Sequence, residues 1–291
     1  MNVLRKPAWL KSSKLGARKA SEISHYLREY NLHTVCESAR CPNRGECFER
    51  GTATFMILGE RCTRRCSFCA VEKELPPLSP DLDEPRRIAE LVNKLKLKHV
   101  VVTTVTRDDL ADGGARHFVA VISAIHRLCP PDTTVEVLVS DLQGVKELVA
   151  EIIDARPDVF NHNIETVSRL YPRVRPGASY ERSLQVLRFA SELNRDLITK
   201  SGFMVGLGET EDEIMSLMKD LRDSAVDILT IGQYMSPSRN HYPVQEYIKP
   251  AVFSLYKGEA LKLGFSLVES APLVRSSYRA ERVRKLIKKR G

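Results

Sequence analysis

Short runs rich in β-branched residues alternate with amphipathic stretches along most of this chain. From residue 53 onward, each run is followed by a stretch with the 3.6-residue apolar period of a helix that covers one face of a sheet. Such alternation is typical of βα units around a parallel sheet. We expect strands at residues 53–59, 99–105, 133–139, 159–165, 198–206 and 227–233, and a further strand at 265–270.

Helices are expected between these strands, at residues 84–97, 115–128, 144–155, 180–193, 210–224 and 251–263. Two of them carry start signals. Asp83 stands two residues before Pro85, and Glu213 stands three residues after Thr210, which is the spacing of a capping box.

These elements amount to six βα units, whereas a complete barrel of this type needs eight. The sequence therefore predicts an α/β fold, a partial (β/α)6 TIM-type barrel that remains open. We assign the barrel to residues 53–270, an N-terminal extension to residues 1–52 and a C-terminal extension to residues 271–291.

Composition places the chain among ordinary soluble globular proteins. Its 291 residues are 43% hydrophobic and 28% charged, which allows a sizeable core without disulfides. No apolar run is long enough for a membrane span, and no secretory leader pattern opens the chain, although its basic first residues share a feature of organellar transit peptides. We expect a cytoplasmic, reducing compartment, where clustered cysteines are more often metal ligands or catalytic thiols than disulfides.

The charge balance is basic. The formal net charge is +8, which favours an acidic partner. Residues 279–291 contribute much of the excess, with Glu281 as their one acid. A solvated helical tail is the alternative interpretation of this segment.

Six of the seven cysteines are clustered between residues 36 and 69. They form a first triad with the spacing Cys-x4-Cys-x5-Cys and a second triad with the spacing Cys-x3-Cys-x2-Cys. The first triad is Cys36, Cys41 and Cys47, and the second triad is Cys62, Cys66 and Cys69. The remaining Cys129 is expected to be a small buried hydrophobic residue.

The second triad falls on the loop after the first predicted strand of the barrel. That loop lies at the C-terminal rim, where such folds place their chemistry. Three thiolates can hold three irons of a four-iron cluster and leave the fourth iron open to a small molecule. Two alternatives are a structural zinc site that also uses a cysteine of the first triad and a set of inert core thiols.

The second triad, with Phe68 before its last cysteine, resembles the signature of the radical S-adenosylmethionine enzymes. The first triad, which precedes it closely, extends the resemblance to the lipoyl synthase family. The likeness covers nearly the whole chain, with conservative variations at Ala8, Phe48 and Met235. The shared segments include "KPAWLK", "CPNRGEC", "TTVTRDDLADGGA", "HNIETV", "RVRPGASYERSLQVL", "TKSGFMVGLGET", "QYMSPSRNHYPV" and "APLVRSSYRA".

This resemblance implies a radical sulfurtransferase that inserts sulfur at C6 and C8 of an octanoyl chain, which is amide-linked to a lysine of a lipoyl carrier domain. Those carbons bear no acidic hydrogen, so a general base would achieve little there. A radical from a cofactor can take the hydrogen, and the protein supplies position and the exclusion of side reactions.

The implied cofactors are two [4Fe-4S] clusters and S-adenosylmethionine. The resemblance assigns the cluster that binds S-adenosylmethionine to the second triad, and an auxiliary cluster, consumed as the sulfur source, to the first. The fourth ligand of the auxiliary cluster is a serine of the "RSSY" motif, for which Ser276 and Ser277 are candidates and Ser277 is our choice. A hard alkoxide suits such iron poorly, so it can dissociate readily.

The resemblance also implies contacts with S-adenosylmethionine. Asn163 and Glu165 stand two residues apart at the end of a predicted strand, so their side chains share a face and suit ribose hydroxyls. Arg175, together with Lys200 or Ser201, is expected near the methionyl carboxylate.

The segment "GFMVGLGE", with Gly202, Met204, Gly206 and Glu209, is the expected adenine contact. "RDDLADGGA" is expected to form part of the same pocket. His241 and Tyr242 are candidates for the substrate entrance.

The implied partners are octanoylated lipoyl carrier domains, namely those of 2-oxoacid dehydrogenase acyltransferase subunits and the glycine cleavage H protein, and an electron donor such as ferredoxin or flavodoxin. No nucleic-acid or membrane partner is expected. A radical tRNA methylthiotransferase would also have two clusters and use positive charge, but the chain shows no added nucleic-acid-binding domain and the spacing of the first triad differs. A zinc-stabilised binding module without catalysis is the alternative outside enzymes.

Overall fold

The computed structural model describes residues 5–10, 17–38, 41, 43–73 and 76–290. Lys11 of "KPAWLK" and Pro42 of "CPNRGEC" therefore lie outside the described residues. In the described part of the chain, no helix combines the length and the apolar character of a membrane span.

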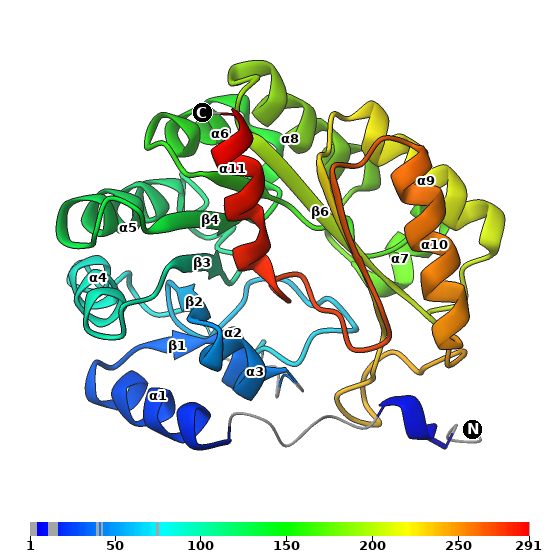
Figure 1. The fold of residues 1–291 in the computed structure, drawn as a ribbon, viewed down its shortest axis with the longest axis horizontal. Helices are drawn as coiled ribbons and strands as arrows, with labels where there is room; N and C mark the ends of the chain where they lie inside the picture. The colour runs from blue at the N-terminus through cyan, green and yellow to red at the C-terminus, as the bar shows by residue number, and fades with distance from the viewer. Residues whose placement is uncertain (1–4, 11–16, 39–40, 42, 74–75, 291) are drawn as a thin grey trace.

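An eight-stranded sheet forms the inner layer of the molecule (Figure 1). The strands follow one another in chain order, and all neighbouring pairs from β2 to β8 are parallel, whereas β1 joins the edge antiparallel to β2. The strands are β1 (His33–Thr34), β2 (Thr52–Ile57), β3 (His99–Thr104), β4 (Thr134–Leu138), β5 (Val159–Asn161), β6 (Ile198–Val205), β7 (Ile228–Gln233) and β8 (Leu267–Ser270).

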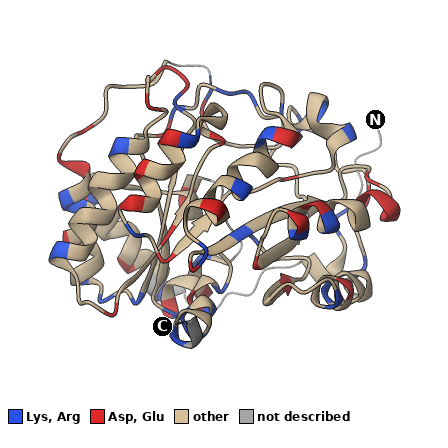
Figure 2. Cartoon of the chain, turned by 90° about the horizontal axis from the view of Figure 1, so that it is seen from above, with Lys and Arg blue, Asp and Glu red and all other residues tan. Residues whose placement is uncertain are grey.

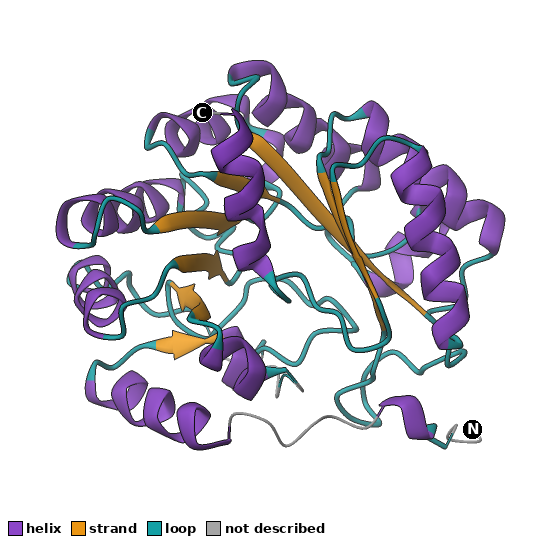
Figure 3. Ribbon diagram, in the orientation of Figure 1, coloured by secondary structure: helices purple, strands orange, loops and turns teal. Residues whose placement is uncertain are grey.

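Helices cover the outer side of this sheet (Figure 3). Those of the barrel are α4 (Glu84–Lys94), α5 (Ala115–Leu128), η2 (Leu142–Gly144), α6 (Lys146–Asp154), η3 (Ser168–Leu170), α7 (Tyr171–Val174), α8 (Tyr180–Leu193), α9 (Glu211–Asp223) and α10 (Pro250–Lys262). Those of the two ends of the chain are η1 (Ala8–Leu10), α1 (Ala17–Glu29), α2 (Val35–Ser38), α3 (Arg44–Glu49), η4 (Ala280–Val283) and α11 (Arg284–Arg290).

The predicted α/β fold is confirmed. The six expected strands are β2 to β7, the further strand is β8, and the six expected helices are α4, α5, α6, α8, α9 and α10. Pairing of β8 with β1 or β2 is absent among the described residues, so the partial barrel is open. The predicted capping box is also present, because Thr210 and Glu213 exchange hydrogen bonds of 3.3 and 2.8 Å.

Two details differ from the predicted elements. β5 ends at Asn161 instead of continuing to residue 165, and Glu165 has a φ of 68° that is incompatible with an extended strand. The Asp83 side chain does not cap α4. Its carboxylate instead accepts hydrogen bonds from Arg86 at 2.8 Å.

Apolar side chains fill the space between the sheet and its helices. One large cluster joins β2, β3 and β4 to α4, α5 and α6, and a second joins β6, β7 and β8 to α8, α9 and α10. The N-terminal extension shares the first cluster, because Ile23 and Leu27 of α1 and Phe48 of α3 are buried in it. The extension therefore packs as part of the barrel core.

The chain after β8 returns across the cavity-facing side of the sheet. Gly232 of β7 lies so close to it that a Cβ atom there would stand 2.2 Å from the Val274 carbonyl oxygen. Val283 of η4 then packs against Val159, Ile198 and Ile228, which open β5, β6 and β7. In Figure 1 the red helix α11 accordingly lies beside the strands and not in the outer layer.

Candidate active site

A single cavity of about 790 Å³ receives side chains from both cysteine triads. The N-terminal extension, the barrel strands and the C-terminal extension all contribute to its walls. Of the candidate site residues that the sequence singled out, those that line it are Cys36, Cys41, Cys47, Cys62, Cys66, Phe68, Cys69, Asn163, Glu165, Arg175, Gly202, Met204, His241, Ser276 and Ser277.

The second triad lies on the loop between β2 and α4, as predicted, and hydrogen bonds hold this loop. The backbone N–H of Thr106 donates to Cys62 Sγ at 3.3 Å. Lys73 Nζ donates to the carbonyl oxygens of Cys66 and Cys69 at 2.7 and 2.5 Å. His241 Nε2 lies 3.1 Å from the same Cys69 oxygen. The path of the loop is thus fixed by protein contacts.

Burial makes the thiolate forms of Cys66 and Cys69 costly. It raises the pKa of Cys66, against the opposing charge of Arg175. It raises the pKa of Cys69 to about 11, against a backbone hydrogen bond and the charge of Lys73. Bound iron would add positive charge that stabilises the thiolate forms, so iron binding would release the thiol protons.

The first triad lies on and between the short helices α2 and α3. Burial, together with the neighbouring thiols, raises the pKa of both Cys36 and Cys47 to about 12. Burial also raises the pKa of Cys41, while the charge of Arg275 lowers it. The backbone N–H of Arg279 donates to Cys47 and lowers its pKa. The C-terminal extension therefore supplies positive charge and a donor to this triad, in addition to the charge of Arg44 on α3.

Further contacts fasten the C-terminal extension to the first triad's surroundings. Asn43 Nδ2 donates to the Leu273 carbonyl at 2.6 Å. The Tyr278 hydroxyl and the Arg279 guanidinium contact the carboxylate of Glu46 at 3.3 and 3.5 Å. The "RSSY" motif thus lies beside the first triad, although more than 200 residues of chain separate the two.

The two serines of this motif have different surroundings. The Ser276 hydroxyl accepts a hydrogen bond from Asn161 Nδ2 at 3.1 Å and donates one to Asn163 Oδ1 at 3.1 Å. Among the described residues, no hydrogen bond of the Ser277 hydroxyl is found, and Ser277 lines the cavity. Ser277 is therefore the serine whose oxygen is available to a metal.

Asn163, Glu165 and Arg175 lie together on the cavity wall. Asn163 Nδ2 donates to Glu165 Oε1 at 3.1 Å, so the two side chains lie together although the strand expected to align them ends at Asn161. Burial raises the pKa of Glu165, against the charge of Arg175. Arg175 Nη1 donates to the carbonyl of Asn163 at 3.1 Å, while its buried Nε has no partner among the described residues. A ligand carboxylate would satisfy that Nε.

The structure does not place Ser201 or Lys200 on the cavity wall. Ser201 is fully buried, and its hydroxyl accepts from the Ile164 N–H at 3.3 Å. Lys200 is buried in an ion pair with Glu136 at 2.8 Å. Adjacent residues of a strand point to opposite faces, so Lys200 shares the face of Gly202 and Met204 but is engaged by Glu136, whereas Ser201 points to the other face. The structure therefore gives no support to the expected contact of either residue with the methionyl carboxylate.

The "GFMVGLGE" segment contributes only its first half to the cavity. Gly202 and Met204 line it, whereas Gly206 and Glu209 do not. A Cβ atom at Gly206 would meet Gln233 Nε2 at 2.2 Å, so this glycine serves packing. Glu209 accepts hydrogen bonds from the N–H groups of Gly206 and Leu207 and holds the turn.

Two other expected contacts also have structural roles. The "RDDLADGGA" segment does not line the cavity, whose wall at this point is formed by residues 103–106. His241 lines the cavity, but Tyr242 does not, and its N–H donates to the Ser67 carbonyl at 2.9 Å.

Sequence reasoning missed several cations at the site, among them Arg64, Lys73 and Arg275. All three line the cavity. Lys73 stands four residues after Cys69, and Arg275 begins the "RSSY" motif, so proximity to the cysteine and serine motifs was the available signal.

The donor set fits iron-sulfur clusters. Each triad offers three soft thiolates at one cavity, which suits iron in such clusters. Within the described ranges, no three or more His, Cys, Asp or Glu side chains are grouped so that they could hold one metal ion. A four-iron cluster binds each thiolate through a different iron and accepts a wider spacing.

Comparison with known proteins identifies the family. Residues 56–221 match the model of the Radical SAM superfamily. The chain is 56% identical over 275 residues to the lipoyl synthase of Rubrobacter xylanophilus, which covers 94% of this chain and 85% of that protein. It is 51% identical over 281 residues to the lipoyl synthase of Alkaliphilus metalliredigens, with 96% of each chain covered.

Solved structures with low sequence identity share the fold. Methylornithine synthase (PylB) superposes with a TM-score of 0.57 at 13% identity, over 88% of this chain and 85% of that chain. The hydrogenase maturase HydG from Carboxydothermus hydrogenoformans superposes with a TM-score of 0.57 at 15% identity, over 94% and 78%. The chain has two cysteine triads at one cavity, and it is 51% and 56% identical to these two lipoyl synthases over nearly its whole length. It therefore belongs to the lipoyl synthase family of radical S-adenosylmethionine enzymes.

Proposed function

We propose that this chain inserts sulfur at C6 and C8 of an octanoyl chain amide-linked to a lysine of a carrier protein, and so forms the lipoyl group. The observation that carries this proposal is the common cavity of the two triads. A substrate carbon held there can stand near both a radical source and a sulfur source. The names of the curated relatives support the same activity.

We assign one [4Fe-4S] cluster to each triad. Cys62, Cys66 and Cys69 would hold the cluster that binds S-adenosylmethionine, and Cys36, Cys41, Cys47 and Ser277 would hold the auxiliary cluster. When bound, these groups supply a radical that takes hydrogen from an unactivated carbon, and the sulfur that replaces it.

The chain's own residues would bind and orient S-adenosylmethionine and hold the auxiliary cluster. Asn163 and Glu165 lie where they can bind ribose hydroxyls, and Arg175 offers an unpartnered Nε to a carboxylate. Met204 and Phe68 give the wall apolar area for adenine. Ser277 offers an oxygen to the auxiliary site that binds iron less firmly than a thiolate does, which suits a cluster that gives up its sulfur.

The partners proposed are octanoylated carrier domains and an electron donor such as ferredoxin or flavodoxin. Lys and Arg residues lie on the ribbon beside the C-terminus (Figure 2). The exposed lysines of α11, Lys285 and Lys288, offer positive charge to an acidic carrier domain. Carrier domains of 2-oxoacid dehydrogenases and the glycine cleavage H protein are the classes that we propose.

Anaerobic reconstitution tests this function. Protein loaded with iron and sulfide should hold about eight irons per chain. Incubation with S-adenosylmethionine, a reductant and an octanoyl-lysine peptide should give thiolated peptide by mass spectrometry. The variant C66A should lose cleavage of S-adenosylmethionine, whereas C36A should retain cleavage and lose sulfur insertion. Stoichiometric zinc, or no thiolated product from fully loaded protein, would refute the proposal.

A further inference from the structure

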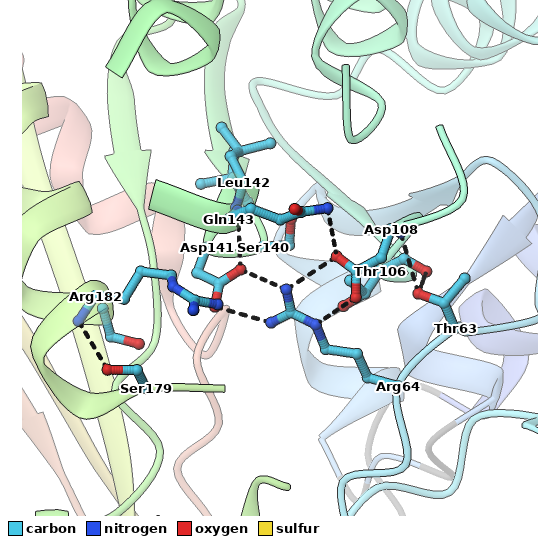
Figure 4. A network of polar contacts seen from close by, with 12 residues as sticks. Thr63, Arg64, Thr106, Asp108, Ser140, Asp141, Leu142, Gln143, Ser179 and Arg182 are labelled. Carbon is cyan, nitrogen blue, oxygen red and sulfur yellow. Dashed lines mark hydrogen bonds and ion pairs between the residues drawn. The ribbon is translucent and has the colours of Figure 1, made fainter. Parts of the chain in front are cut away.

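Arg64 lies inside the second triad, between Cys62 and Cys66, and its side chain is held between two carboxylates (Figure 4). Its Nε and Nη2 donate to Asp108 at 2.7 and 2.9 Å. Its Nη1 and Nη2 donate to Asp141 at 2.8 and 2.7 Å. The side chain is only 7% exposed. Arg64 therefore joins the cysteine loop to the loops that follow β3 and β4.

The residues before Arg64 are fixed to the same loop after β3. The N–H and the hydroxyl of Thr63 both donate to the Thr106 carbonyl, at 3.0 and 2.9 Å. The Asp108 N–H donates to Thr63 Oγ1 at 3.1 Å. Together with the bond from Thr106 N–H to Cys62 Sγ, these contacts hold three consecutive residues of the cysteine loop.

The other carboxylate stands on a strained loop. Asp141 is fully buried, and the next two residues, Leu142 and Gln143, have φ values of 43° and 53°. Neither residue is a glycine, so the left-handed conformation is unfavourable for both. Asp141 accepts a hydrogen bond from the Gln143 N–H at 3.2 Å. Such strain persists where surrounding contacts require it, and here the contacts of Asp141 are those with Arg64 and, at 3.4 Å, with Arg182.

The geometry of the guanidinium matters as much as its charge. A planar fork can bond two carboxylates at once, whereas the ammonium of a lysine is a single compact point of charge. Arg65, the next residue, is exposed. The sequence therefore places two arginines side by side, and the fold uses only the first to bridge the loops.

We propose that Arg64 is a positioning residue for the cluster of the second triad, which holds the Cys62–Cys66 segment in its iron-binding conformation before iron arrives. Asp108 and Asp141 are the fixed points to which it ties that segment. This inference rests on the proposed assignment of a cluster to the second triad.

Release of iron to a chelator tests the role. Full-length protein is loaded anaerobically with iron and sulfide, and iron release to the chelator is followed over time. The kinetic phase that wild-type protein shows and C66A lacks is assigned to the second triad. In R64K and R64Q this phase should be at least tenfold faster, while the phase of the first triad keeps its wild-type rate. R65Q, which removes the same charge one residue away, should release iron as wild type does. The melting temperature of each iron-free variant is measured alongside.

The outcomes separate the hypotheses. Wild-type release from the second triad in both Arg64 variants would overturn the inference, and so would equal acceleration of both phases, because a general loss of stability would act on both. If R64Q does not fold, R64K, which keeps the charge, decides alone. If wild-type protein itself shows no phase that C66A removes, the cluster assignment fails and the inference falls with it.

Discussion

The Ser276 hydroxyl donates a hydrogen bond to Asn163 Oδ1 at 3.1 Å and thereby joins the C-terminal extension to the wall of the cavity. Asn161 donates to the same hydroxyl. One serine of the "RSSY" motif is thus engaged in holding the segment, and its neighbour remains available for another purpose.

The two serines should consequently differ in their effects. S277A should reduce sulfur insertion by at least a hundredfold and leave cleavage of S-adenosylmethionine near the wild-type rate, since the second triad is untouched. S276A should impair both activities by about fivefold, because loss of a hydrogen bond of this kind costs about 1 kcal/mol and Asn163 lies on the cavity wall proposed to bind S-adenosylmethionine. Quantification of 5'-deoxyadenosine and thiolated peptide in the same reactions checks both. Equal profiles for the two variants would contradict the assignment of Ser277.

Arg175 should control the affinity for S-adenosylmethionine. R175K keeps the charge but removes the unpartnered Nε, so the dissociation constant should rise about tenfold, which corresponds to about 1.4 kcal/mol. Equilibrium dialysis with iron-loaded protein measures this. R173K, at an exposed position two residues earlier, is the matched control and should bind as wild type does.

Gly202 should not accept a side chain. A Cβ atom there would stand 2.1 Å from Thr230 Oγ1 and 3.3 Å from Asn163 Oδ1, so G202A should lower the free energy of unfolding by about 1 to 3 kcal/mol. In contrast, Gly258 lies within α10 with nothing within 4 Å of its Cβ position. G258A should raise the free energy of unfolding by about 0.5 to 1 kcal/mol. Chemical denaturation of iron-free protein tests the pair, and similar shifts for both would contradict the packing argument.

His162 should make the iron-free protein sensitive to mild acid. Burial lowers its pKa from 6.5 to about 4, and the charge of Arg175 adds to the effect. Because the unfolded chain binds the proton more readily, this group's contribution to stability is present above pH 6.5 and is lost as the pH falls toward 4. Between pH 6.5 and 4.5 the loss should be about 2 kcal/mol.

The control is the variant H162N. In H162N the difference in unfolding free energy between pH 6.5 and pH 4.5 should be smaller by about 2 kcal/mol. Glu136 and Asp141, whose pKa values are about 2 despite their burial because of Lys200 and Arg64, lose their contributions at lower pH. An unchanged slope in H162N would contradict the prediction.

The lysines of α11 should contribute to binding of an acidic carrier domain. K285Q/K288Q should raise the dissociation constant about threefold to tenfold at low salt, and the difference should vanish at high salt. Truncation of residues 279–291 is a poorer test, because Val283 is part of the core. K219Q/K262Q, which removes two exposed lysines from the outer helices, is the control. Equal weakening by both pairs would indicate only an effect of net charge.

The barrel could be predicted because its strands and helices carry strong periodic patterns. Most of the strands from β2 to β7 are buried runs rich in β-branched or aromatic residues, and α4, α5, α6, α8 and α9 each have one apolar face. β1 has only two residues, which is too short for any period to register. Its antiparallel pairing with β2 is a tertiary contact that no local pattern contains.

The site was predictable where a residue belongs to a spaced motif, as the cysteines do. It was not predictable where the outcome depends on the direction of a side chain within a strand. Ser201 and Met204 both lie on β6, yet only Met204 lines the cavity. Arg64 and Arg65 are chemically identical neighbours, and only the positions of Asp108 and Asp141 in the folded chain distinguish them.

The bond between Asn43 and the Leu273 carbonyl connects residues 230 positions apart, and this separation has a consequence for biosynthesis. While the ribosome is still translating the barrel, the first three cysteines have emerged but Arg275, Ser277 and Arg279 do not yet exist. Iron delivered to the nascent chain would therefore meet an unfinished pocket. Completion of the first triad's pocket therefore has to wait for residues 275–279, whereas Thr106, Asp108 and Asp141, which hold the loop of the second triad, are synthesised earlier.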